Sequence, residues 1–76
     1  MSRSSQTVAI IARELGVTID RCTTGTDLSD LGADSMDMAL IAVALEEAFD
    51  IDLDKDTEDN WITVGDIVAA VDGVMV

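Results

Sequence analysis

The sequence LGADSMDMALIAVALEEAF, residues 31–49, decides the fold because it contains the strongest helix signal in the chain. Asp34 or Ser35 can cap the exposed N–H groups at the start of a helix, and Asp37 falls in the first turn, where the helix dipole favours a carboxylate. Neither Gly nor Pro occurs between Asp34 and Asp50. We therefore predict a helix over residues 34–49.

The apolar residues of this helix form an unusually wide stripe. Glu46 and Glu47 leave only a narrow polar strip beside it. A helix with this pattern is either nearly surrounded by protein or carries apolar surface for a partner. The stripe consists of Met38, Ile41, Leu45 and Ala48 or Phe49, with Met36, Leu40 and Val43 beside it.

Weaker signals precede this helix. Apolar residues at spacings of three and four predict a helix over residues 5–15 that ends at Gly16. Residues 17–34 are rich in Thr, Asp, Ser and Gly, and predict a long connection anchored by a few buried apolar side chains. A loop of this length in a small domain is usually functional. The apolar positions of the first helix are Val8, Ile11, Ala12 and Leu15.

Further helices are predicted after residue 50. A short helix is expected at residues 56–59, and Thr63 with Asp66 forms a variant of the capping box that opens a last helix, which Gly73 should end. The chain is thus predicted to be one all-α domain over residues 1–76. We expect a small four-helix bundle with three main helices, one short helix and a long loop between helices one and two. The apolar face of the last helix is Val64, Ile67, Val68 and Val71.

The charge balance restricts the partners. Sixteen Asp and Glu residues oppose four Lys and Arg residues, which gives a net charge of -12. Nucleic acids and anionic membrane surfaces are therefore disfavoured, whereas basic patches on other proteins are attracted. No apolar stretch is long enough to span a bilayer, so we expect a cytoplasmic protein, without membrane insertion, that works as a monomer. Because most of the acids follow residue 26, the docking surface is expected there.

Ser35 is the candidate functional residue. It stands where the long loop meets the strongest helix, so its hydroxyl is expected at an exposed tip, beside N–H groups that favour a phosphate. Gly32 allows a tight turn just before it. Taken alone, Gly, Asp and Ser before an apolar run are simply what a capped helix start looks like.

The surrounding pattern makes the segment more specific. Residues 30–37 (DLGADSMD), followed by residues 44–49 (ALEEAF) and residues 63–66 (TVGD), closely resemble the acyl carrier protein family. The resemblance covers most of the chain, from the end of the first helix to Val71. It implies that a phosphopantetheinyl transferase esterifies Ser35 with 4'-phosphopantetheine from coenzyme A. The thiol of that arm then carries an acyl group as a thioester, and the carrier itself is no enzyme.

The resemblance also implies surfaces for partners and cargo. Synthases, acyl-loading enzymes and transferases with basic patches are expected to dock on Asp34, Met36, Asp37, Leu40, Glu46 and Glu47. An acyl chain is expected between helices lined by Met38, Ile41, Leu45, Trp61 and Ile67, although such residues are more often plain core. Three positions depart from the family, which usually has carboxylates in place of Leu40 and Ala48 and a smaller apolar residue in place of Trp61.

Competing interpretations are weaker but differ in kind. An alternating acidic run resembles calcium ligands and consists of Asp50, Asp52, Asp54 and Asp56. Whether the loop begins at Asp50 or at Asp52, Gly and Glu do not fall where an EF-hand needs them, so no metal site is predicted beyond a loose acidic cluster. The sequence contains no His, so neither Ser35 nor the lone Cys22 has a His base. An unmodified acidic interaction module remains an alternative. Among carriers, fatty acid or related lipid synthesis is the first expectation, and a polyketide or other specialised pathway is the second.

Overall fold

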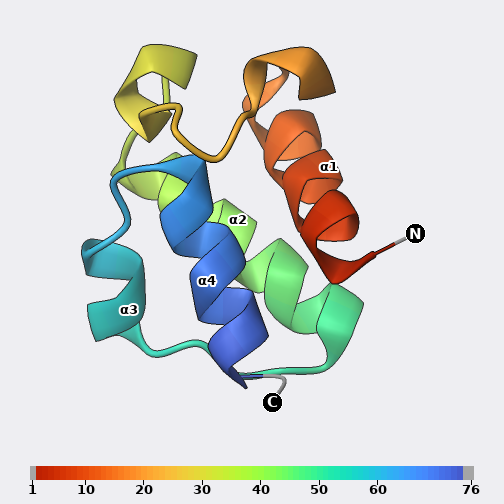
Figure 1. Cartoon of the computed structure of the whole chain (residues 1–76). Helices are drawn as coiled ribbons and strands as arrows, with labels where there is room; N and C mark the ends of the chain where they lie inside the picture. Colours follow the sequence, from red (N-terminus) through yellow and green to blue (C-terminus); the bar gives the residue numbers. More distant parts are fainter. Residues whose placement is uncertain (1, 75–76) are drawn as a thin grey trace.

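Four α-helices and two 3-10 turns make up the computed structural model, which describes residues 2–74 (Figure 1). The first helix, α1 (Arg3–Leu15), begins after Ser2, whose hydroxyl accepts a hydrogen bond from the Ser5 N–H at 3.1 Å. The helix therefore starts two residues earlier than predicted, because Ser2 rather than a later residue supplies the cap. It ends as expected at Gly16, which adopts the left-handed conformation.

The second helix, α2 (Ser35–Phe49), ends where predicted and begins one residue after the predicted start. Asp34 is its N-cap, and the helix ends at Asp50, which adopts a left-handed conformation with φ of 55°. Ile41 and Leu45 are completely buried, while Met38 and Phe49 are half-buried. The predicted inner stripe is therefore correct, except that Ala48 is exposed.

The connection between α1 and α2 contains two 3-10 turns, η1 (Ile19–Arg21) and η2 (Leu28–Leu31). Leu28 and Leu31 are buried and hold η2 against the core. Ile19, by contrast, is 55% exposed, so it does not help to anchor the connection. The connection is also hydrogen-bonded to the start of the last helix, because the Leu28 N–H donates to the Ile62 carbonyl at 2.8 Å.

The third helix, α3 (Lys55–Asp59), is a single short turn close to the predicted position. The fourth, α4 (Val64–Val74), begins with the predicted capping pair. The Thr63 hydroxyl accepts from the Asp66 N–H, and the Asp66 carboxylate accepts from the Ile62 and Thr63 N–H groups. The predicted end at Gly73 is wrong, because the helix includes Gly73 and continues to Val74, the last described residue.

The core lies where α1, α2 and α4 meet. The first helix contacts both α2 and α4, and α3 packs beside α2 (Figure 1). All three main helices and the 3-10 turn η2 contribute side chains, so the predicted four-helix bundle with a long first loop is confirmed. The largest completely buried apolar residues are Ile11, Leu28, Ile41, Leu45, Ile67, Val64 and Val71.

Candidate functional site

Ser35 is the first residue of α2, and the preceding loop fixes its position. Leu31 is buried at the end of η2, and Gly32 then takes a left-handed φ of 82°, a conformation that favours glycine. The Ala33 N–H donates to the Leu28 carbonyl at 3.1 Å, which closes the turn. The chain therefore leaves the core at Leu31 and presents Ser35 on the surface, where its side chain is exposed.

A reciprocal capping box surrounds Ser35. The Asp34 carboxylate accepts from the Asp37 N–H at 2.9 Å, and the Asp37 carboxylate accepts from the Asp34 N–H at 3.1 Å. Aspartates on both sides of the serine therefore cap the helix, and the Ser35 hydroxyl is not needed for this task. Of the two capping residues that the sequence allowed, the structure has Asp34.

The backbone around the hydroxyl favours a phosphate only weakly. The capping box occupies the N–H of Asp37, and the Met38 N–H donates to the Asp34 carbonyl, so the N–H groups of Ser35 and Met36 remain at the positive end of the helix dipole. The two carboxylates beside them repel an anion. A phosphate would therefore stay here through a covalent ester to Ser35 rather than through non-covalent binding.

An open groove of about 410 Å³ adjoins Ser35. It lies between the start of α2 and the short helix α3, and its walls combine apolar and charged side chains. The lining residues are Ala33, Asp34, Ser35, Met38, Lys55, Glu58, Asp59 and Trp61.

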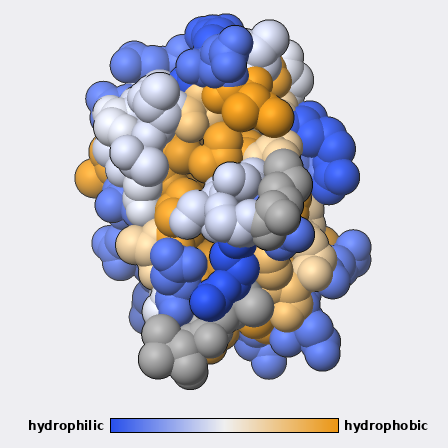
Figure 2. Space-filling model, turned by 45° about the vertical axis from the view of Figure 1, so that its right-hand side comes forward, coloured by the Kyte–Doolittle hydropathy of each residue, from blue (hydrophilic) through white to orange (hydrophobic). Residues whose placement is uncertain are grey.

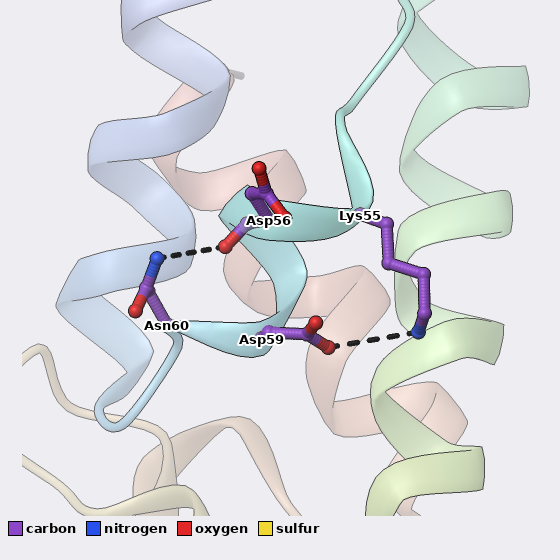
Figure 3. A network of polar contacts seen from close by, with 4 residues as sticks. All are labelled: Lys55, Asp56, Asp59 and Asn60. Carbon is purple, nitrogen blue, oxygen red and sulfur yellow. Dashed lines mark hydrogen bonds and ion pairs between the residues drawn. The ribbon is translucent and has the colours of Figure 1, made fainter.

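The α3 side of this groove carries a charged pair. Lys55 Nζ lies 3.6 Å from Asp59 Oδ1, and Figure 3 shows both side chains on the side of α3 that faces α2. Asn60 closes the other end of the short helix by donating to the Asp56 carbonyl at 2.8 Å. Lys55 is the only basic residue after Arg21, so the sole basic side chain of residues 22–76 lines the same groove as Ser35.

A comparison with known protein families shows which family has this site. A model of the phosphopantetheine attachment site family matches residues 5–71, and the exposed Ser35 falls within this range. The chain belongs to this family. Its domains carry 4'-phosphopantetheine covalently and work with modifying and synthase enzymes. The resemblance to acyl carrier proteins seen in the sequence is thus confirmed at the level of the carrier domain.

The predicted acyl-pocket residues of this carrier domain separate into two groups. Met38 and Trp61 line the groove beside Ser35. Ile41, Leu45 and Ile67 are completely buried in the core and do not line it. The sequence could not distinguish the groups, because all five residues are apolar. It also missed Lys55, Glu58 and Asp59, whose place at the groove depends on how α3 packs on α2.

The predicted docking residues of the carrier domain are also placed unequally. Met36 and Leu40 are 72% and 49% exposed, and Glu47 is exposed further along α2. Glu46, in contrast, is half-buried, and its carboxylate accepts a hydrogen bond from the Leu53 N–H at 2.9 Å. This bond holds the loop after α2, so Glu46 has a structural partner inside the carrier domain.

Other candidate sites of the carrier domain find little support. Among residues 2–74, no group of three or more His, Cys, Asp or Glu side chains is placed to hold a metal ion, and this includes the acidic run after α2. Cys22 is buried, and burial raises the pKa of its thiol, although Arg21 partly opposes the shift. Within the same residues, no helix combines the length and the apolar character needed to cross a membrane.

Proposed function

We propose that this carrier domain holds acyl intermediates as thioesters on a 4'-phosphopantetheine arm at Ser35 and presents them to biosynthetic enzymes, without catalysing a reaction itself. The observation that carries the proposal is the exposed Ser35 at the first residue of α2, freed from capping by Asp34 and Asp37. The groove beside it gives a short cargo a place to fold back against the domain.

The partner surface in this proposal is the exposed side of α2. Met36, Leu40 and Val43 recur at spacings of four and three and are all at least 49% exposed, so they form one apolar row on the helix. The carboxylates of Asp34, Asp37 and Glu47 border this row. An enzyme with a small apolar patch framed by basic residues matches this surface in both charge and apolar character.

The pathway is the finer part of the proposal. Fatty acid or related lipid synthesis is our first assignment, in the cytoplasm, and a polyketide or other specialised pathway is the alternative. A partner with fewer basic and more apolar docking residues than usual is expected in either case, because Leu40 replaces a carboxylate on the docking helix.

The test of the proposal is modification of the folded protein. The purified chain is incubated with coenzyme A and a broad-specificity phosphopantetheinyl transferase, and the intact mass is measured. We expect one phosphopantetheinyl group on wild type and on Ser29→Ala, which alters an exposed serine of the preceding loop, and none on Ser35→Ala. If folded wild type gains no mass with several transferases, the protein is better explained as an unmodified acidic interaction module.

A further inference from the structure

The side chain of Trp61 contains an unsatisfied polar atom. Trp61 is 7% exposed, and its Nε1 is buried without a hydrogen-bond partner among the described residues. It is the only buried side-chain nitrogen or oxygen in residues 2–74 of which this is true. Buried donors are nearly always paired, and leaving one unpaired costs free energy, so a group of this kind requires an explanation.

The position of Trp61 suggests an explanation for the unpaired donor. Trp61 is one of the residues that line the groove beside Ser35, together with Met38 on α2 and the charged side chains of α3. An arm on Ser35 that folds back into the groove would bring its cargo, as well as its own amide groups, against the residue that holds the unpaired donor. A donor beside an attachment site favours a ligand with a hydrogen-bond acceptor over one without.

The charged wall of the groove disfavours a purely apolar ligand. Lys55, Glu58 and Asp59 form its α3 side, opposite the apolar Met38 and Ala33. A plain alkyl chain laid here would cover charged groups and remove water from them without compensation. A chain that carries an oxygen near its attached end can be covered on the apolar side and still accept a hydrogen bond.

We propose that the Trp61 indole N–H donates a hydrogen bond to an oxygen of the acyl chain beyond the thioester, so that the carrier shelters 3-oxoacyl cargo in preference to saturated alkanoyl cargo. This inference rests on the proposed function, because it needs an arm on Ser35. It assigns to Trp61 the selection of cargo rather than any part in attachment.

Binding of the cargo requires a small opening of the groove, because Nε1 is shielded from solvent. Met38 is the adjustable wall. Its unbranched side chain is half-buried and can change rotamer at little cost, whereas Ile41 behind it is fixed in the core. Loading should therefore move Met38 and Trp61 and leave the packing of α1, α2 and α4 intact.

The composition of the chain allows a direct observation. Trp61 is the only tryptophan, so a ¹⁵N-labelled sample gives one indole N–H resonance. This resonance is compared in the unmodified, phosphopantetheinylated, hexanoyl-loaded and 3-oxohexanoyl-loaded protein, after intact mass has verified each form. We expect a downfield shift of the indole proton and slower exchange with solvent in the 3-oxohexanoyl form alone.

A second measurement removes the donor but keeps an aromatic ring. Trp61→Phe is loaded with each cargo, and the rate of thioester cleavage by hydroxylamine is measured. The loss of one hydrogen bond should speed cleavage of the 3-oxohexanoyl form about two- to ten-fold and change that of the hexanoyl form much less. Ile62→Val, a change at the neighbouring exposed residue, should leave both rates unchanged.

The results distinguish the two proposals. If intact mass shows no group on Ser35, the carrier function itself fails. If the arm and cargo are present but the indole resonance is the same in all loaded forms, the role of Trp61 is wrong. Equal acceleration of both cargoes by Trp61→Phe also overturns it, because loosening of the groove alone would have that effect.

Discussion

Replacement of Asp34 tests whether the helix cap and the charge at the proposed modification site are separate properties. In Asp34→Ala the hydrogen bond from the Asp37 N–H is lost, while the Asp34 N–H still donates to the Asp37 carboxylate. Only one half of the capping box therefore breaks. Loss of an N-cap side chain costs about 1 kcal/mol, within a range of roughly 0.5–2 kcal/mol.

Asp34→Asn is the matched control. Asparagine caps helices about as well as aspartate, and its amide oxygen can accept from the same N–H. Both variants remove one negative charge from a chain with a net charge of -12, so the change in self-repulsion cancels when the two are compared. We expect Asp34→Ala to unfold about 1 kcal/mol more easily than Asp34→Asn.

The assay is urea unfolding of the unmodified protein, followed by circular dichroism, with equal m-values required for the comparison. In parallel, kcat/KM is measured for the transferase. This kcat/KM should fall in both variants by a similar factor of up to about five, which is the effect expected from the loss of one exposed ion pair. Equal unfolding free energies in the two variants would refute the capping argument, and a much slower modification of Asp34→Ala alone would refute the charge argument.

Three further predictions concern stability and reactivity. Gly65→Ala should destabilise by about 1–2 kcal/mol in urea unfolding, because the new Cβ would lie 2.8 Å from the Thr24 carbonyl oxygen, whereas Gly73→Ala, in open space, should not. Hydrogen bonds from the Thr63 and Ile62 backbone lower the pKa of Asp66, so the stabilisation by its carboxylate is complete above about pH 4 and is lost as the pH falls further. Asp66→Asn should therefore reduce the difference in urea midpoint between about pH 7 and about pH 3. An unchanged difference would contradict this. Alkylation of Cys22 should be much slower in the native protein than in urea at the same pH, because burial raises the pKa of the thiol and restricts access; equal rates would show that the residue is open to solvent.

The helices could be predicted because their signals are local. Apolar spacing and capping residues predicted α2 to within one residue, and the Thr63 and Asp66 pair predicted the start of α4. The errors arose where the local signal was weak or misleading. Gly73 has open space around it and no left-handed conformation, so it continues the helix instead of ending it.

The candidate residue Ser35 could be found from the sequence, whereas its surroundings could not. A serine after Asp34 at the start of a strong helix is visible in the sequence, whereas the groove depends on the packing of α3 against α2. Exposure of individual apolar residues is likewise a tertiary property. Ile19 is exposed beside a second, mostly apolar groove between α1, η1 and α4. Figure 2 likewise shows hydrophobic surface among polar residues. The periodicity of the sequence alone could not locate this exposed apolar surface.

The order of Asp34 and Ser35 has a physical reason. A serine at the N-cap would turn its hydroxyl toward the helix N–H groups, where a bulky ester would break the cap. Placing the aspartate at the cap and the serine at the first helical position gives the helix its hydrogen bonds and leaves the hydroxyl exposed. In the proposed function, the same two carboxylates also attract a basic enzyme to the site. Attachment of the arm can therefore leave the fold unchanged, and a carrier that visits many enzymes needs this independence of fold and cargo.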